Sequence, residues 1–275
     1  MAFALRRRGD WERALSLLER SRELDPKNWL TWVELGFTNE RMGRPQEALE
    51  AYRKSADLSE RKSFVFMMMG MYEATVRGDL APMRRTLDAM GPDNPDRPMG
   101  EMWYAHQLGD YAEALAWADK VPVAVISDDE IYLPLSLIRF NILTLMDSPD
   151  ATAAGAQVIQ DLEAVIAENP KDWRVRVAYG VALALAGRGD EAIREARLAT
   201  DLMPVTRDAV NGERAMNDQA AIYLLAGRED EAAALFRERL QSPYSGLTPN
   251  AIRFDPRLHG SLDSPAMRSV LEPTP

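Results

Sequence analysis

The sequence predicts an all-α fold: a solenoid of about seven helix–turn–helix repeats with a small carboxyl-terminal cap. The first observation behind this prediction is a glycine that recurs at intervals of roughly 35 residues, a spacing typical of helical repeats. The second is a small or apolar residue five positions after each glycine. The third is a proline near the end of several repeats. The glycine-centred pairs are Gly9/Ala14, Gly43/Ala48, Gly78/Met83, Gly109/Ala114, Gly187/Ala192 and Gly227/Ala232, and the prolines are Pro26, Pro95, Pro170 and Pro204.

Each recurring glycine marks a junction between two helices. Glycine adopts a positive φ without strain, so it can end the first helix of a pair. An acid follows directly in three copies, at Asp10, Asp79 and Asp110, where it suits the positive end of the second helix. The alanine five residues after the glycine is expected where the antiparallel helices come closest, because a larger side chain would force them apart. Proline then ends the second helix, as at Pro26 and Pro204.

Together these residues resemble the tetratricopeptide repeat (TPR). The best copy consists of Trp32, Leu35, Gly36, Gly43, Ala48, Tyr52 and Leu58. Further copies are centred on Gly187 and Gly227. The resemblance implies a right-handed α-solenoid in which the first helix of each pair lines a concave groove. It also implies that extended or helical peptides dock in this groove.

The repeats can be aligned by their glycines. They then cover residues 1–27 (partial), 28–62, 63–95, 96–125, 126–171, 172–205 and 210–243, and residues 244–275 follow as a capping segment. The repeat at 126–171 departs most from the pattern, because MDSPDATAAGA lengthens its inter-helix loop. The turn-rich GPDNPDRP at 91–98 is the expected bend in the solenoid.

The two ends of the array differ from its interior. Only MAFALRRR precedes Gly9, so the first repeat lacks most of its first helix and would leave an apolar face uncovered. We expect either a fragment of a longer protein, which we favour, or a dimer that covers this face. Residues 244–275 are expected to pack on the last repeat. Their stretch LTPNAIRFDPRLHGSLDSPAMRSVL resembles a tail that follows TPR arrays in bacterial signalling proteins, including kinases, adenylate cyclases and winged-helix regulators, and residues 259–261 depart from it.

Composition and motifs argue against several classes of function. The formal net charge is −10, which disfavours general nucleic-acid binding but permits basic partners. The chain has no cysteine, and nothing in the sequence brings its two histidines, His106 and His259, together. No apolar run reaches the ~18 residues of a membrane span, and no phosphate loop, catalytic triad or metal-binding motif is present. We therefore predict no enzymatic activity, no catalytic residue, no metal site and no cofactor.

The informative side chains lie on the predicted concave wall. The alignment places there Val33, Phe37, Arg41, Arg174, Val177, Arg214 and Asn217. Arg174 and Arg214 are equivalent positions on neighbouring repeats, and their guanidinium groups could hold a peptide carboxylate or an acidic side chain. The alternative for this pair is solvation or a salt bridge to a neighbouring glutamate. Asn217 could hydrogen-bond to a peptide backbone.

These observations favour a non-catalytic protein-interaction module. It would bind a peptide or partner domain in its groove, as the sensing or docking arm of a bacterial signalling protein. One alternative is a stand-alone adaptor that forms homo-oligomers through the amino-terminal repeat. Another is a small-molecule sensor that encloses its ligand near the bend, in repeats three to five. We expect a soluble protein without membrane insertion, in the cytoplasm rather than the periplasm, with a protein partner and no nucleic-acid partner.

Overall fold

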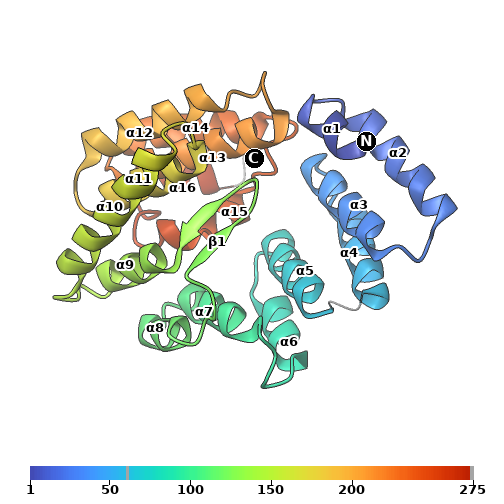
Figure 1. Ribbon diagram of the computed structural model, residues 1–275, viewed down its shortest axis with the longest axis horizontal. Helices are drawn as coiled ribbons and strands as arrows, with labels where there is room; N and C mark the ends of the chain where they lie inside the picture. Colours follow the sequence, from blue (N-terminus) through green and yellow to red (C-terminus); the bar gives the residue numbers. More distant parts are fainter. Residues whose placement is uncertain (60–61, 273–275) are drawn as a thin grey trace.

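Seven consecutive helix pairs form a curved array in the computed structural model, which describes residues 1–59 and 62–272 (Figure 1). The prediction of an all-α solenoid is therefore confirmed. The pairs are α1 (Ala2–Arg7) and α2 (Trp11–Leu24), α3 (Trp29–Arg41) and α4 (Pro45–Leu58), α5 (Lys62–Arg77) and α6 (Ala81–Ala89), α7 (Arg97–Gln107) and α8 (Tyr111–Ala118), α9 (Leu135–Leu145) and α10 (Ala151–Glu168), α11 (Trp173–Leu185) and α12 (Gly189–Leu202), and α13 (Ala209–Leu225) and α14 (Glu229–Gln241).

The junction residues behave as their chemistry predicts. A positive φ occurs at all six recurring glycines, from Gly9 at 78° to Gly227 at 74°. In the loop between α9 and α10, which lacks such a glycine, Asp147 takes the left-handed conformation with φ of 50°. The alanines of the second helices, such as Ala48 and Ala192, are fully buried against the preceding helices.

The first and last helix pairs meet, so the array closes on itself (Figure 1). Helix α1 packs against α13, and the Trp11 indole stacks on the Tyr244 ring, with centroids 5.1 Å apart. Arg7 forms an ion pair with Asp208, the residue that caps the start of α13. The sequence led us to expect an uncovered apolar face at the first repeat. The structure covers this face only in part: Trp11 is 1% exposed and its cover comes from the same chain, whereas Phe3, Leu17 and Leu24 stay exposed.

A β-hairpin interrupts the helical array between α8 and α9. Its strands β1 (Val125–Ser127) and β2 (Tyr132–Pro134) pair antiparallel, with Ile126 opposite Leu133. The repeat alignment predicts helix here, as part of the repeat at 126–171, and this prediction is wrong. The β-branched residues, the prolines and the turn at Asp128, whose side chain accepts two main-chain N–H groups, favour a hairpin instead. The hairpin tip forms ion pairs with two amino-terminal arginines, Asp129 with Arg7 and Glu130 with Arg41.

The carboxyl-terminal segment has two parts. Helix α16 (Pro265–Leu271) packs on α14 and buries Met267 and Val270 in the same core as Phe236, as a cap does. The preceding α15 (Pro249–Arg253) and the short helix η1 (Pro256–Leu258) instead contact α5, α7 and α13 on the inner side of the curve (Figure 1). We refer to residues 245–258 as the inner segment.

Candidate functional site

The inner segment is held against the concave surface by hydrogen bonds to its main chain. The carbonyl of Ser245 accepts from Nη1 of Arg41 and from Nδ2 of Asn217, each at 3.0 Å. The carbonyl of Phe254 accepts from Nε2 of Gln107 at 2.7 Å. These hydrogen bonds are made to main-chain carbonyl groups, so they do not depend on the side chains of the segment.

Side chains of the inner segment add specific contacts. Ile252 and Leu258 are each 1% exposed and join the core formed by α9 to α14. Asn250 donates from Nδ2 to the carbonyl of Thr75 on α5, at 2.9 Å. The segment thus contacts helices at both sides of the curved array.

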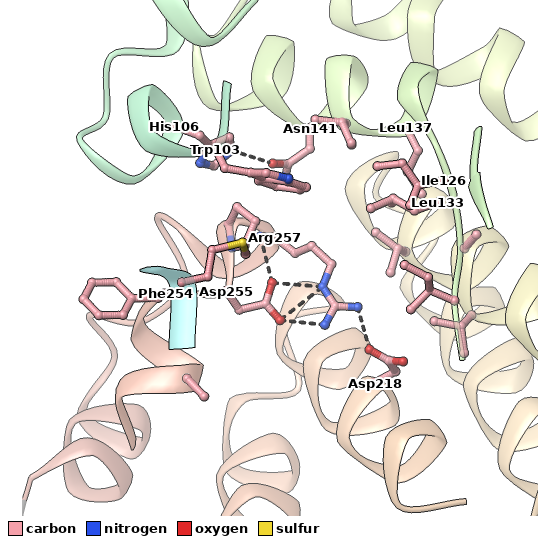
Figure 2. A pocket seen from close by; sticks show the side chains of 18 of the residues that line it. Trp103, His106, Ile126, Leu133, Leu137, Asn141, Asp218, Phe254, Asp255 and Arg257 are labelled. Carbon is pink, nitrogen blue, oxygen red and sulfur yellow. Dashed lines mark hydrogen bonds and ion pairs between the residues drawn. The ribbon is translucent and has the colours of Figure 1, made fainter. Parts of the chain in front are cut away.

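An ion-pair network around the buried carboxylate of Asp218 fixes the end of the inner segment (Figure 2). Arg257 donates from Nη1 to Asp218 of α13 at 2.7 Å and from Nη2 to Asp255 at 2.6 Å. Arg214, one turn before Asp218, donates to the other Asp218 oxygen at 3.1 Å. Burial disfavours the charged form of Asp218, but the two arginines outweigh this cost and hold the pKa of its carboxyl below the ordinary value. Asp218 is therefore ionised, and its buried negative charge requires a positively charged partner such as Arg257.

Beside this network lies a cavity of about 420 Å³ (Figure 2). Its walls come from α5, α6, α7, α9, α11, α13, the hairpin and the inner segment. Most of the lining is apolar or aromatic, including Met83, Met99, Trp103, Ile126, Leu133, Leu137, Trp173, Val177 and Val181. Charged residues in the lining are Glu130, Arg174, Arg214, Asp218, Asp255 and Arg257. Repeats three to five contribute lining residues, together with repeats six and seven, and the cavity is of ligand size.

Most of the residues predicted for a peptide site lie at this surface. Arg174, Val177 and Arg214 line the cavity, and Arg41 and Asn217 contact the inner segment. The two guanidinium groups expected to hold a partner carboxylate are both engaged within the chain: Arg214 with Asp218, and Arg174 with Asp172 at 2.6 Å. Arg174 also donates to the carbonyl of Asp128 at the hairpin tip.

The two remaining predicted site residues, Phe37 and Val33, belong to neither group. The centroid of the Phe37 ring is 4.8 Å from the guanidinium group of Arg6 and 5.1 Å from that of Arg41, so the ring stabilises cations of the amino-terminal repeats. Val33 is half-buried on α3 and lines neither the cavity nor the inner-segment contacts described above.

The two histidines come together, although the sequence gives no indication of this contact. The ring centroids of His106 and His259 are 4.9 Å apart, and Nε2 of His106 is 3.2 Å from Oδ1 of Asn141 on α9. Burial lowers the pKa of His106 to about 4, so its imidazole is neutral at physiological pH. Within the described residues, no group of three or more His, Asp or Glu side chains is arranged to hold a metal ion.

Sequence reasoning missed Asp218 and the inner segment. Asp218 follows Arg214 by one helical turn, so a pair between them was detectable. The Asp-Pro-Arg stretch at 255–257 indicates, by its sequence, a turn before a helix. Its role as a partner of Asp218 depends on a contact between residues far apart in the chain, and repeat spacing carries no signal for such a contact.

Comparison with protein-family models gives two matches, both described as tetratricopeptide repeat. One covers residues 1–61 and 159–204, and the other covers residues 100–120 and 214–238, so together they span more than half of the chain. The chain belongs to the tetratricopeptide-repeat family. A comparison with curated proteins finds no significant match.

Several solved structures resemble this TPR chain. The carboxyl-terminal part of a TPR protein from Cytophaga hutchinsonii is 10% identical, with a TM-score of 0.38, and the match covers 90% of this chain and 98% of that one. Yeast Tom70 is 15% identical, with a TM-score of 0.43, and the match covers 97% of this chain and 63% of Tom70. YrrB, described as a TPR protein with an unusual peptide-binding site, is 15% identical, with a TM-score of 0.28 and coverages of 88% and 96%.

Within residues 1–59 and 62–272, no helix is both long enough and apolar enough to cross a bilayer.

Proposed function

We propose that this TPR chain is a non-catalytic protein-interaction module whose concave surface binds a peptide segment of a partner. One observation carries the proposal: the concave surface already holds a peptide segment, residues 245–258 of the same chain. Side chains of Arg41, Asn217 and Gln107 bind its carbonyl groups, and Asp218 binds its Arg257. Concave surfaces of helical repeats are suited to such binding.

The partner segment would carry an arginine beside apolar residues. Asp218 is 3% exposed and takes Arg257 at 2.7 Å, while the core around Ile252 takes an aliphatic side chain. A net charge of −10 also favours a basic partner. The sequence instead predicts that Arg174 and Arg214 bind an acidic group of the partner. We propose a basic group, because both of these arginines already hold a carboxylate of the chain.

The inner segment would compete with the partner. A segment tethered to its own site has an effective concentration in the millimolar range, so a free peptide must bind tightly or the segment must be weakened first. Occupation by the tail would therefore keep the groove closed until a stronger partner arrives. The tail of this chain resembles a tail that follows TPR arrays in bacterial signalling proteins. In such a protein, the TPR array with this groove would act as a docking arm.

A peptide added in trans tests the proposal. A fluorescein-labelled peptide of residues 244–260 is titrated into the intact chain and into the variant Arg257→Ala, with fluorescence anisotropy as the readout. Because Arg257→Ala weakens the tethered competitor and leaves Asp218 paired with Arg214, the variant should bind the peptide at least about tenfold more tightly than the wild type.

The matched control for this titration is Arg268→Ala in α16, whose guanidinium contacts only the nearby carbonyl of Asp263 among the described residues. This variant should bind the peptide as weakly as the wild type does. A peptide that carries Glu in place of Arg257 should not bind to any of the three proteins. Equal, weak binding of the unchanged peptide to Arg257→Ala and to the wild type would contradict the proposal, provided that circular dichroism shows both chains folded.

A further inference from the structure

We infer that the cavity beside the inner segment binds an uncharged, mainly apolar small molecule that carries a hydroxyl or carbonyl group. The inference goes beyond peptide recognition and does not depend on it, because the cavity is a second space next to the inner segment. Its volume of about 420 Å³ lies within the range of small-molecule sites, which is roughly 300–1,000 Å³.

The walls favour an apolar body. The indole of Trp103 on α7 faces the inner segment across the space, and Ile126, Leu133 and Leu137 line one side (Figure 2). Val177 adds an aliphatic surface from α11. An apolar molecule would therefore gain from leaving water on several sides.

The charges favour an uncharged ligand. Arg257 is bound to Asp218 and Asp255, and Arg214 to Asp218. The two other charged groups in the lining are paired outside it: Arg174 with Asp172, and Glu130 with Arg41 at 3.3 Å. A ligand with a formal charge would have to break one of these pairs, whereas a neutral ligand leaves all of them intact.

One polar pair in the wall accounts for the hydroxyl or carbonyl group. His106 and Asn141 are bonded to each other, and Nδ1 of His106 and Nδ2 of Asn141 are buried without a hydrogen-bond partner among the described residues. In either tautomer of the neutral imidazole, at least one hydrogen-bond donor or acceptor of this pair has no partner. A buried unsatisfied polar group costs free energy. Both nitrogen atoms are inaccessible in the structure, so a hydroxyl or carbonyl group of a ligand would reach them only after rotation of the His106 or Asn141 side chain, and it would then remove this cost.

The inner segment forms part of the wall. Phe254, Asp255, Pro256 and Arg257 all line the cavity, so a bound molecule would contact the segment and the helices together. The ligand should therefore hold the inner segment in place, because it binds only the state in which both walls are present.

A neutral fluorescent probe tests the inference on the full chain. N-phenyl-1-naphthylamine, whose emission rises in apolar surroundings, is titrated into the wild type and then displaced with 1-octanol, octanoate or octylamine. The expected result is saturable binding of one probe per chain, with 1-octanol effective at concentrations at least about tenfold lower than those of either charged competitor. Absence of saturable binding, or equal displacement by a charged competitor, would overturn the inference.

Cavity-filling variants separate this site from binding elsewhere on the surface. Ile126→Trp in β1 and Val177→Trp in α11 place an indole in the cavity from two different elements. The matched control is Val125→Trp, because Val125 adjoins Ile126 on the same strand but faces the other side and is 37% exposed. Probe affinity should fall at least about tenfold in the two filled variants and stay unchanged in the control. Unchanged affinity in both filled variants, with circular dichroism like that of the wild type, would also overturn the inference.

Discussion

The indole of Trp11 and the ring of Tyr244 stack with their centroids 5.1 Å apart and their planes 13° apart. Trp11 begins the second helix of the array, and Tyr244 lies just after its last helix pair, so this contact joins the two ends. The ion pair between Arg7 and Asp208 closes the same junction. Because the two ends of the array are in contact, helices surround the concave surface in which the inner segment lies.

Removing the stacked ring should loosen the amino-terminal repeat. We expect Tyr244→Ala to lower the free energy of unfolding by about 2 kcal/mol, because it removes an aromatic pair and exposes a buried indole. Urea unfolding measures the loss, and hydrogen exchange should show it first in residues 2–24. Tyr244→Phe keeps the ring and should behave like the wild type. If Tyr244→Ala leaves exchange in residues 2–24 unchanged, the ends are not joined by this contact.

The buried His106 should make stability depend on pH. Its pKa is lowered from 6.5 to about 4 by burial, so between these values the unfolded chain binds a proton that the folded chain does not. Above pH ~6.5 His106 is neutral in both states and does not lower the stability of the fold. As the pH falls toward ~4, protonation of the unfolded chain lowers the free energy of unfolding by up to ~3 kcal/mol. Urea titrations near pH 7.5 and near pH 5 measure this difference.

The variant His106→Gln isolates the effect. Glutamine can bond to Asn141 but does not titrate, so the difference in stability between the two pH values should shrink. His259 contacts His106, and burial lowers its pKa too, so His259→Gln should shrink the difference as well. Wild-type pH dependence in His106→Gln would show that this imidazole is not held neutral.

The start of α13 passes so close to the preceding loop that only glycine fits. A Cβ on Gly212 would lie 2.5 Å from the Cα of Val205, and a main chain cannot move aside as a flexible side chain does. Gly212→Ala should therefore lower the free energy of unfolding by about 2–3 kcal/mol. A Cβ on Gly91 would meet no described atom within 4 Å, so Gly91→Ala is the control and should change this free energy by less than ~0.5 kcal/mol. Equal stability of the two variants in urea would contradict the close approach.

A buried ion pair joins the last two helices of the array. Arg239 of α14 donates to Glu213 of α13 at 2.7 Å, and both side chains are at least nine-tenths buried. Arg239→Ala would leave the glutamate buried without its cation, and we expect a loss of about 3–5 kcal/mol in urea unfolding. Arg239→Met together with Glu213→Gln removes both charges and should lose much less. A double variant as unstable as Arg239→Ala would show that packing, rather than charge, is responsible.

The helix pairs could be predicted from sequence because their signals are local. Gly43, Ala48 and Tyr52 lie within ten positions of one another and specify a turn, a close helix contact and a buried ring. The prediction was wrong for residues 125–134, where alignment to a helical repeat outweighed the β-branched residues and prolines that form the hairpin.

The candidate site was predicted only in part. Repeat alignment placed Arg174, Val177 and Arg214 on the inner wall, where they are found. It could not show that Arg214 is already paired, or that Arg257 reaches Asp218. These contacts depend on how the array curves and closes, which is set by the sum of small rotations between repeats and not by the spacing of residues within one repeat.

The central claim is that the concave surface holds residues 245–258 as it would hold a partner peptide. Native-state hydrogen exchange of the intact chain tests it most directly. The amides of Ile252, Phe254 and Leu258, which donate within the segment, should exchange far more slowly than in a free peptide of residues 244–260. In Arg257→Ala this protection should fall while that of α11 and α12 stays. Exchange in the wild-type segment as fast as in the free peptide would contradict the account.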